Sequence, residues 1–479
     1  MNFAMVAYLL GQICKIEATL MILPLGVSFI YGERLQLAFL IPIAVLLAIG
    51  IPLTIKKPQN THFYAKDAFA VVALSWFVMS FFGSAPFVIS GAIPNCIDAF
   101  FETASGFTTT GATILTVIEG LPMGILFWRS LTHWIGGMGV LVFMLAIMPE
   151  RETQSIFLMK AESTGPQVGK IVSKLRVTAR ILYGIYIGLT LIEFIFLLCG
   201  GMPVFDSIVN SFSTAGTGGF SIKNASIAGY NSAYAEYVIA VFMILFGINF
   251  NIFYLILVGQ VREALGSEEL RVYLGVIAVS TAILTVNLYK IYGTFEKTFR
   301  ISFFQVSSII TTTGFATADI GTFPTLSKFV LLVLILFGAC AGSTGGGIKI
   351  ARVIILIKGA RAEIRRLISP NAVVSSKFEG KPLDSALVRS TGAYLTAYVG
   401  LFAISALAVS IFDDFGFEAN FTGVMTCLGN VGPGLGKLSG GVFADYSRVS
   451  KLILSFDMIA GRLELFPVLM LFSPKEYRR

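Results

Sequence analysis

The sequence predicts an all-α integral membrane protein in which four similar repeats surround one pore, preceded by a two-helix hairpin. Composition is the first observation that supports this fold class. The 479 residues are 56% hydrophobic and only 13% charged, whereas roughly 25% of a soluble protein's residues are charged. Secondly, apolar stretches long enough to cross a bilayer recur along the chain. Thirdly, a segment rich in Thr, Ser and Gly recurs four times between them.

Ten apolar stretches have the length of a membrane span. They cover residues 3–30, 36–55, 68–90, 123–148, 178–200, 235–260, 272–291, 327–357, 388–411 and 448–472. The first two predict an N-terminal hairpin, residues 1–60. The other eight form four pairs, which predict pore repeats at residues 61–150, 151–265, 266–370 and 371–479. The first stretch lacks a basic n-region and a cleavage site, so we expect it to be retained as a span.

Basic residues gather in a few short loops and are nearly absent between them. Residues 91–120 contain no Lys or Arg, and residues 200–234 contain only Lys223. This alternation is the positive-inside pattern, and it predicts that both termini are cytoplasmic. The net charge of +8 therefore reflects topology, and nucleic-acid binding is not expected.

The residues needed for catalysis are sparse. The chain has five cysteines, far apart in sequence, and two histidines, His62 and His133. So few and so widely spaced cysteines and histidines predict neither a disulfide framework nor a metal site, and they provide no nucleophile–base set for catalysis. We therefore expect that the protein is not an enzyme.

The outer connection of each pair repeats one pattern. The four copies read DAFFETASGFTTTGATI, FDSIVNSFSTAGTGGFSI, RISFFQVSSIITTTGFATAD and EANFTGVMTCLGNVGPGLG. Each begins with about ten helix-compatible residues and then changes to a composition that leaves the helix. Our register places Gly111, Gly219, Gly314 and Gly432 at equivalent positions. Gly218 also fits in the second copy, and that alternative stays open.

Four such re-entrant segments are suited to lining a pore. Non-helical backbone at membrane depth is tolerated only where protein or a water-filled cavity surrounds it. Carbonyls in a ring can replace the hydration shell of a monovalent cation, and glycine permits the backbone angles that this requires. Half-helix C-termini would add partial negative charge. The predicted filter residues are Thr109, Thr110, Gly111, Thr217, Gly218, Gly219, Thr312, Thr313, Gly314, Asn430, Val431 and Gly432.

Two groups of charged residues flank the first and fourth copies. Carboxylates at an entrance would raise the local cation concentration. For each one taken alone, ordinary solvated loop charge is the preferred interpretation, and only as a group do they favour a cation pore. They are Asp98, Glu102, Glu119, Asp413, Asp414 and Glu418. Arg129 and His133 flank Trp134, and we expect both to be interfacial anchors with satisfied hydrogen bonds.

Four copies of span, pore loop and span, with TTTGAT, GTGGFS, TTTGFAT and GNVGPGLG as filter segments, resemble the Trk/Ktr/HKT superfamily of cation transporters. The lead-in spans, HWIGGMG at 133–139, AGSTGGGIK at 341–349 and GRLELF at 461–466 are similar to its bacterial TrkH branch. In that superfamily, glycine in all four loops goes with potassium permeation, and serine in the first loop goes with sodium. The fourth loop departs from the pattern, because Asn430-Val431 replaces a threonine run.

The resemblance implies potassium uptake across the bacterial inner membrane by a homodimer. It implies K+ as the permeant ion, no organic cofactor in this chain, and a cytoplasmic nucleotide-binding regulatory subunit of the TrkA type. The sequence has no soluble nucleotide-binding domain, and the short basic linkers at 149–177 and 358–387 suit docking of such a partner.

The run FGACAGSTGGGIKI, residues 337–350, interrupts an apolar span. It cannot form a stable helix, because each glycine costs about 1 kcal/mol relative to alanine. A phosphate loop is not expected, since the Gly-Lys-Ser/Thr ending is missing. We expect a flexible loop that gates the pore, a role that the resemblance also implies, while a packing kink is the alternative. The predicted gate residues are Gly342, Ser343, Thr344, Gly345, Gly346, Gly347 and Lys349, together with Arg462.

Arg462 lies in an apolar span, where a charge is costly and marks a candidate functional site. It either pairs with Glu464 or snorkels, or it points into the pore below the filter and opposes a resident cation. The matching arginine of the TrkH pattern favours the pore-facing position.

The alternative function is an ion-coupled secondary transporter, a K+/H+ or K+/Na+ symporter or a sodium-permeable relative. Such proteins also use glycine-broken helices, often from inverted repeats. All four repeats here have the same orientation by their loop charges, which favours a channel-like pore.

Overall fold

The computed structural model describes residues 1–59, 64–139, 175–370 and 376–472. The N-terminal hairpin consists of α1 (Phe3–Leu20), which continues into α2 (Ile22–Ile30), and of α3 (Gln36–Ile55). Small residues let the two arms approach closely. A Cβ atom at Gly50 would lie only 2.8 Å from the carbonyl oxygen of Gly11.

The rest of the described chain repeats one order of helices. The first repeat has α4 (Ala65–Gly83), α5 (Ala85–Ile89), α6 (Cys96–Phe107) and α7 (Met123–Gly137). The second repeat has α10 (Leu175–Cys199), α11 (Val204–Ala215), α12 (Ala233–Phe246), α13 (Phe250–Leu257) and α14 (Val261–Gly266). The third repeat has α15 (Glu268–Tyr292), α16 (Phe295–Ile310), α17 (Thr325–Phe337) and α18 (Ile350–Ile368), and the fourth has α19 (Ser385–Phe412), α20 (Phe417–Gly429), α21 (Arg448–Arg462) and α22 (Phe466–Leu471).

Short elements complete the described residues. Three 3₁₀ turns, η1 (Ser226–Tyr230), η2 (Ile320–Thr322) and η3 (Gly436–Leu438), lie in the outer loops. A small antiparallel hairpin of β1 (Lys377–Phe378) and β2 (Lys381–Pro382) follows α18.

Six predicted spans are confirmed as helices long and apolar enough to cross a membrane. Within the described residues these are 3–30, 36–55, 66–89, 177–199, 268–292 and 385–412. They are the two arms of the hairpin and the first span of each repeat. Large apolar side chains face outward on them, for example Val286 and Ile411, each 78% exposed, as expected for a lipid-facing surface.

The second span of each repeat is not a continuous helix. This corrects the prediction of three uninterrupted spans and one span interrupted by the glycine-rich run. The helices α7, α12, α17 and α21 end after 15, 14, 13 and 15 residues. The axis then turns by 90° between α12 and α13, and the glycine-rich loop follows α17. Residues 140–148 of the predicted span 123–148 lie outside the described residues.

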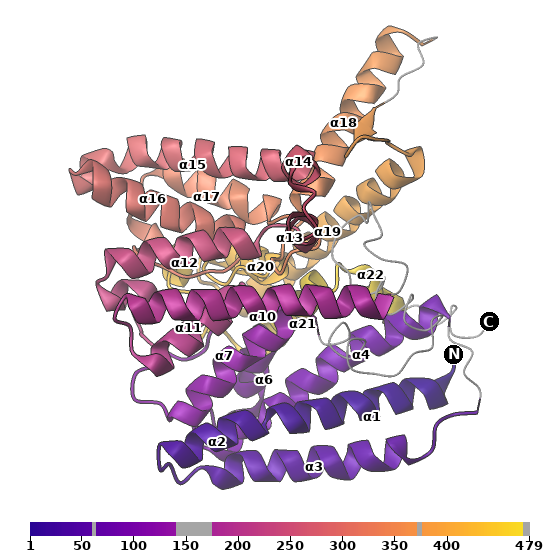
Figure 1. Ribbon diagram of the computed structural model, residues 1–479, viewed down its shortest axis with the longest axis vertical. Helices are drawn as coiled ribbons and strands as arrows, with labels where there is room; N and C mark the ends of the chain where they lie inside the picture. Colours follow the sequence, from indigo (N-terminus) through magenta and orange to yellow (C-terminus); the bar gives the residue numbers. More distant parts are fainter. Residues whose placement is uncertain (60–63, 140–174, 371–375, 473–479) are drawn as a thin grey trace.

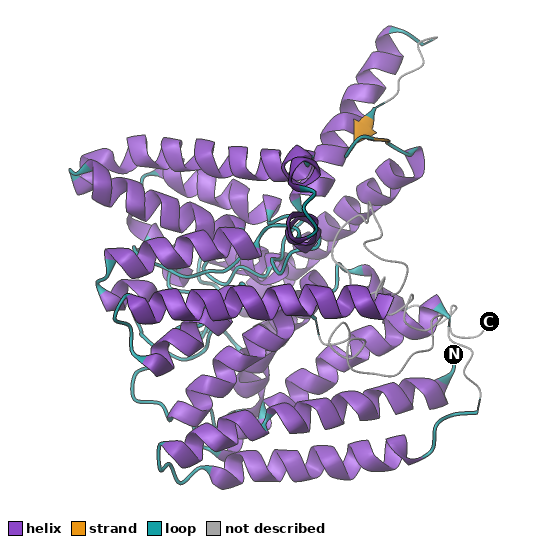
Figure 2. Cartoon of the chain, viewed as in Figure 1, coloured by secondary structure: helices purple, strands orange, loops and turns teal. Residues whose placement is uncertain are grey.

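The helices enclose a region of irregular backbone (Figure 2), where the four filter segments meet. The N-terminal hairpin lies at one edge of the molecule and the third repeat at the opposite edge (Figure 1). The largest apolar core joins the hairpin, the first repeat and α21–α22, and a second core packs the third repeat. Helix α18 projects beyond the bundle (Figure 1).

Candidate ion pathway

The pore helices α6, α11, α16 and α20 end in the same C-terminal cap. The first residue of each cap has a left-handed backbone, with φ of 55°, 53°, 58° and 55° at Thr109, Thr217, Thr312 and Asn430. The next residue donates its N–H to the carbonyl five positions earlier at 2.8–2.9 Å in every copy. This is a Schellman cap, where glycine is the usual left-handed residue. Asparagine tolerates that conformation better than threonine, so the fourth segment departs in sequence while keeping the geometry.

The glycine after each cap packs against the neighbouring segment. A Cβ atom at Gly111 would lie 2.1 Å from the Gly218 carbonyl oxygen, and one at Gly219 would lie 2.0 Å from that of Thr313. The same contact joins Gly314 to Val431 at 2.2 Å, and Gly432 to Thr110 at 2.5 Å. The last contact returns to the first segment, so the four segments form a closed ring. Their backbone oxygens therefore lie at equivalent positions around one axis.

Gly219, not Gly218, occupies the position equivalent to the other ring glycines. Its φ is +77°, beside +78° at Gly111, +83° at Gly314 and +91° at Gly432. The carbonyl of Gly218 instead corresponds to those of Thr110, Thr313 and Val431, the residues that precede the glycines.

The glycine-rich loop lies directly beneath this ring. The Gly346 N–H donates to the Thr312 hydroxyl at 2.6 Å. A Cβ atom at Gly345 would lie 2.9 Å from the Thr311 carbonyl oxygen, and one at Gly346 would lie 2.6 Å from that of Gly429. The loop therefore contacts the third and fourth pore segments, and Ser343 through Lys349 are buried.

The loop is also held to the break between α12 and α13. Cys340 donates its N–H to the Gly247 carbonyl at 3.0 Å, and Thr344 donates its hydroxyl to the Phe246 carbonyl at 3.2 Å. The Lys349 ammonium donates back to the Gly345 carbonyl within the loop. These contacts make the loop a compact structure and not a simple kink in one helix.

Arg462, at the end of α21, is 7% exposed and bridges three repeats. Its guanidinium donates to the Thr109 hydroxyl at 3.2 Å and to the Thr344 carbonyl at 2.7 Å. It also donates to the carbonyls of Gly136 and Gly137 at 2.5 and 2.6 Å. The alternative that Arg462 pairs with Glu464 is wrong, because Glu464 forms its ion pair with Arg352.

Glu102 and Arg129 form a buried ion pair behind the ring, which the sequence did not predict. Arg129 Nε lies 2.6 Å from Glu102 Oε1, and the side chains are 2% and 0% exposed. Glu102 accepts the Thr113 hydroxyl and the Ile114 N–H after the first filter segment, while Arg129 donates to the Ser221 carbonyl after the second. The pair therefore connects two neighbouring segments. The expectations that Glu102 is an entrance charge and Arg129 an interfacial anchor are both wrong.

His133 is also buried, so it is not an interfacial anchor. Its ring stacks on Phe220 with centroids 4.1 Å apart, and the Arg129 guanidinium carbon lies 3.5 Å from the centroid of the same ring. Neither ring nitrogen has a hydrogen-bond partner among the described residues, which corrects the expectation of satisfied hydrogen bonds. The histidine thus supports the second filter segment by packing.

Three of the remaining predicted entrance carboxylates hold the outer loops together. Asp98 pairs with Lys451 at 2.8 Å, Glu119 accepts the Asn224 N–H at 3.2 Å, and Asp413 accepts the Ser447 N–H at 3.0 Å. Asp414 and Glu418 are exposed. A structural role therefore accounts for most of this group.

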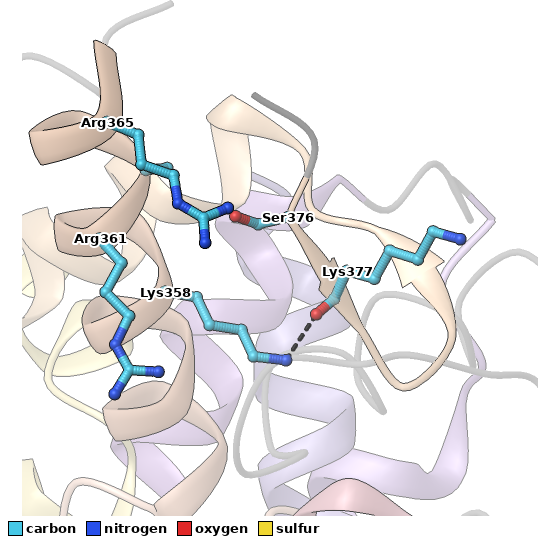
Figure 3. A pocket seen from close by; sticks show the side chains of 6 residues that line it. Lys358, Arg361, Arg365, Ser376 and Lys377 are labelled. Atoms are coloured by element: carbon cyan, nitrogen blue, oxygen red, sulfur yellow. Dashed lines mark hydrogen bonds between the residues drawn. The ribbon is translucent and has the colours of Figure 1, made fainter. Parts of the chain in front are cut away.

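A basic pocket of about 210 Å³ lies between α18 and the hairpin β1–β2 (Figure 3). Lys358, Arg361 and Arg365 line it from one face of α18, and Ser376 and Lys377 from the hairpin. Lys358 Nζ donates to the Lys377 carbonyl at 2.5 Å and pairs with Glu268 at 2.6 Å. Arg361 and Arg365 have no carboxylate partner within the part of the chain that the structure describes, so the pocket is strongly positive.

Comparison with known proteins identifies the family. The TrkH family model, described as a cation transport protein, matches residues 36–477, which include all four filter segments, the glycine-rich loop and Arg462. The chain belongs to the TrkH family. The family agrees with the resemblance found in the sequence, and the helical repeat arrangement described above is consistent with it.

Relatives of the family match along their whole length. The chain is 37% identical to the Trk system potassium uptake protein TrkH of Salmonella typhimurium and 36% identical to that of Escherichia coli K12, covering 100% of each chain. It is 32% identical to the E. coli K12 protein TrkG, over 98% of this chain and 97% of TrkG. The crystal structure of the potassium transporter TrkH from Vibrio parahaemolyticus superimposes with a TM-score of 0.90 at 30% identity, covering 100% of both chains.

Proposed function

We propose that this TrkH-family protein takes up K+ through the ring of its four filter segments. The closed ring is the observation that carries the proposal, because it gathers backbone oxygens from four segments around one axis. Carbonyl oxygens in that arrangement replace the hydration shell of K+. The relatives with matching length are named potassium uptake proteins, which supports K+ as the transported ion.

The filter proposed here comprises the cap residues, the carbonyls that precede the glycines, and the glycines themselves. The four pore helices point their C-termini toward the ring, and the partial negative charge of those ends favours a cation there. Gly111 supports selectivity for K+, since serine at that position accompanies sodium permeation in the superfamily that the sequence resembles.

Flux through the purified chain in liposomes tests this proposal. We expect K+ and Rb+ to pass at least about tenfold faster than Na+ and Li+, a ratio that corresponds to about 1.4 kcal/mol. Gly314→Ser should lower that ratio, because its side chain would collide with the Val431 carbonyl. Equal flux of all four ions through the unmodified protein would contradict the proposal.

We further propose that the glycine-rich loop and Arg462 form the gate. Their contacts with Thr109 and Thr312 place a guanidinium charge and a buried loop immediately below the ring, where a fixed positive charge repels an approaching cation. Shortening residues 342–347 should raise basal K+ flux. Arg462→Ala should also raise basal K+ flux, and the ring of the four filter segments should stay intact in this variant. Unchanged flux in both variants would exclude the gate.

Transport coupled to H+ or Na+ is the alternative mechanism. It predicts that a proton or sodium gradient alone drives K+ uphill into liposomes. The proposed pore predicts instead that K+ flux follows the K+ gradient and the membrane potential, with a reversal potential that is insensitive to pH.

We also propose a topology and an assembly. The basic loops favour a bacterial inner-membrane protein with both termini cytoplasmic, and labelling of single cysteines from either side tests this. A homodimer rests on the resemblance alone, and mass photometry in detergent tests it. The repeat boundaries at residues 60, 150, 265 and 370 stay predictions.

A cytoplasmic nucleotide-binding subunit of the TrkA type is the proposed regulatory partner. The basic pocket beside α18 supports docking, since Arg361 and Arg365 offer guanidinium groups to acidic side chains (Figure 3). We expect Arg361→Glu with Arg365→Glu to weaken binding of the purified partner without changing the fold.

A further inference from the structure

We propose that Glu269 is a positioning residue that holds the glycine-rich loop closed, and that the cytoplasmic hairpin β1–β2 acts on it through Glu379. The inference rests on the proposed function of the loop as a gate. It adds the side chain that fastens the loop and the route by which the cytoplasmic surface reaches it.

Glu269 fastens the loop at both ends. It lies in the first turn of α15 and is 5% exposed. Its Oε1 atom accepts the N–H of Ala341 at 2.7 Å and the N–H of Ala351 at 3.2 Å. Ala341 immediately precedes the glycine-rich run that begins at Gly342, and Ala351 lies in the first turn of α18. One carboxylate oxygen therefore sets the separation between the two ends of the loop.

This attachment complements the contacts in the middle of the loop. Thr312 and Arg462 hold the centre of the loop against the filter, whereas Glu269 holds its ends against α15. One carboxyl oxygen has the lone pairs to accept both N–H groups. Loss of the carboxylate would leave two buried amides without their acceptor, and this favours a rearranged loop.

Glu379 connects the hairpin to the same helix end. It lies in the turn between β1 and β2 and accepts the Glu269 N–H and the Ser267 hydroxyl, both at 2.9 Å. From the other side, Lys358 of α18 donates to the Lys377 carbonyl (Figure 3) and also to Glu268. The hairpin thus sits between α15, which carries Glu269, and α18, which follows the loop. A displacement of the hairpin would change the position of α15 relative to α18.

The basic pocket lies at this junction, between α18 and the hairpin. Acidic side chains of a partner that enter it would compete with Glu268 for Lys358 and move the hairpin. Binding of a partner in the cytoplasm would therefore act on the glycine-rich loop through two connected contacts, that of Glu379 with α15 and that of Glu269 with the loop. Such a device requires two states of the carboxylate contact, one engaged and one released.

Potassium flux through the full-length protein in liposomes, without any partner, tests the role of Glu269. Glu269→Ala should raise basal flux about tenfold, as loss of about 1.4 kcal/mol from the closed state predicts. Glu269→Gln keeps a neutral oxygen that can accept the same N–H groups, so it should raise basal flux less than Glu269→Ala does. The K+/Na+ flux ratio should not change, because the ring is untouched. Glu363→Ala is the matched control, since Glu363 pairs with Arg366 on the exposed face of α18.

A variant shortened at residues 342–347 separates failure of this inference from failure of the gate. Raised flux in the shortened protein with unchanged flux in Glu269→Ala would overturn the role of Glu269 and keep the gate. Unchanged flux in both would overturn the gate and the inference with it. A raised flux with an altered K+/Na+ ratio would also overturn it, because Glu269 would then act on the filter.

Hydrogen–deuterium exchange tests the hairpin and covers the case in which Glu269→Ala does not fold. Glu379→Ala and Glu269→Gln should each speed amide exchange in residues 338–351 and leave exchange in residues 104–112 unchanged. Exchange in residues 338–351 that stays at the level of the Glu363→Ala control would overturn the proposed route.

Discussion

The buried pair of Glu102 and Arg129 gives the clearest consequence at the scale of single residues. Two charges removed from water are costly unless each one keeps its partner. Glu102→Gln should therefore destabilise the protein by about 3–5 kcal/mol, the usual cost of breaking a buried pair. It should also lower the K+/Na+ flux ratio, since the first filter segment loses its carboxylate contact and Arg129, which holds the second segment, loses its partner. Thermal unfolding in detergent and liposome flux are the two measurements.

Glu363→Gln is the control for that prediction. Glu363 and Arg366 also form an ion pair, but their side chains are 63% and 55% exposed, and exposed pairs contribute roughly 0–1 kcal/mol. An equal loss of stability in both variants would show that the burial of Glu102 is not what matters. An unchanged flux ratio in Glu102→Gln would confine the pair to a purely stabilising role.

No local sequence signal could have revealed this pair. Glu102 and Arg129 are 27 positions apart, on different helices, and each one read alone is a single charge near a membrane surface. Their burial follows from how α6 and α7 pack, which is a tertiary property. The ring glycines, in contrast, could be predicted, because a glycine repeated in register is visible in the sequence. Only the choice between Gly218 and Gly219 as the ring glycine of the second segment needed the backbone angles.

At the scale of elements, the left-handed caps connect the filter to the gate. The Thr312 hydroxyl accepts the Gly346 N–H from the loop, whereas the Thr217 hydroxyl, at the equivalent cap, donates within its own segment to Gly216. Thr312→Val removes the loop's acceptor while keeping the shape of the side chain. Basal K+ flux should rise roughly two- to tenfold, because one such hydrogen bond contributes about 0.5–1.5 kcal/mol.

Thr217→Val supplies the matched comparison. It makes the same chemical change at the same cap position of the filter but touches no gate residue. Any effect on the filter itself should therefore be common to both variants, and we expect the larger rise in basal flux in Thr312→Val. A similar rise in both variants would mean that threonine hydroxyls act on the filter itself and not on the contact with the loop.

The helix breaks show where prediction from sequence ends at this scale. The break after α17 is visible as a glycine-rich run, and Gly247 marks the one after α12. The break after α21 passes through Glu464 and Leu465, which have φ of 55° and 66°, although neither residue favours that conformation. Tertiary contacts impose it, as when Arg352 binds Glu464. The first span of each repeat was predicted correctly, because a long apolar stretch is enough to identify a continuous membrane-spanning helix.

At the scale of the whole molecule, the four repeats act as one ring only if every contact between neighbours is kept. Each glycine touches the next segment's carbonyl at a distance that leaves no space for a side chain. A substitution in one repeat must therefore displace the backbone of another repeat. This distinguishes a shared filter from four independent loops, which would tolerate a change in any single copy.

The ring predicts that Gly111→Ala, Gly219→Ala, Gly314→Ala and Gly432→Ala each lower the K+/Na+ flux ratio, and to a similar extent. All four positions have a positive φ, and a Cβ atom would lie 2.0–2.5 Å from a backbone oxygen in every case. Gly440→Ala, in the fourth outer loop, is the control, because a Cβ atom there meets no described atom within 4 Å. Liposome flux of K+ and Na+ measures the ratio. If one of the four glycines tolerates alanine while the other three do not, the segment that carries it does not belong to the ion-selective ring. The fourth segment is the most stringent test of this prediction, because Asn430 and Val431 replace the threonines there.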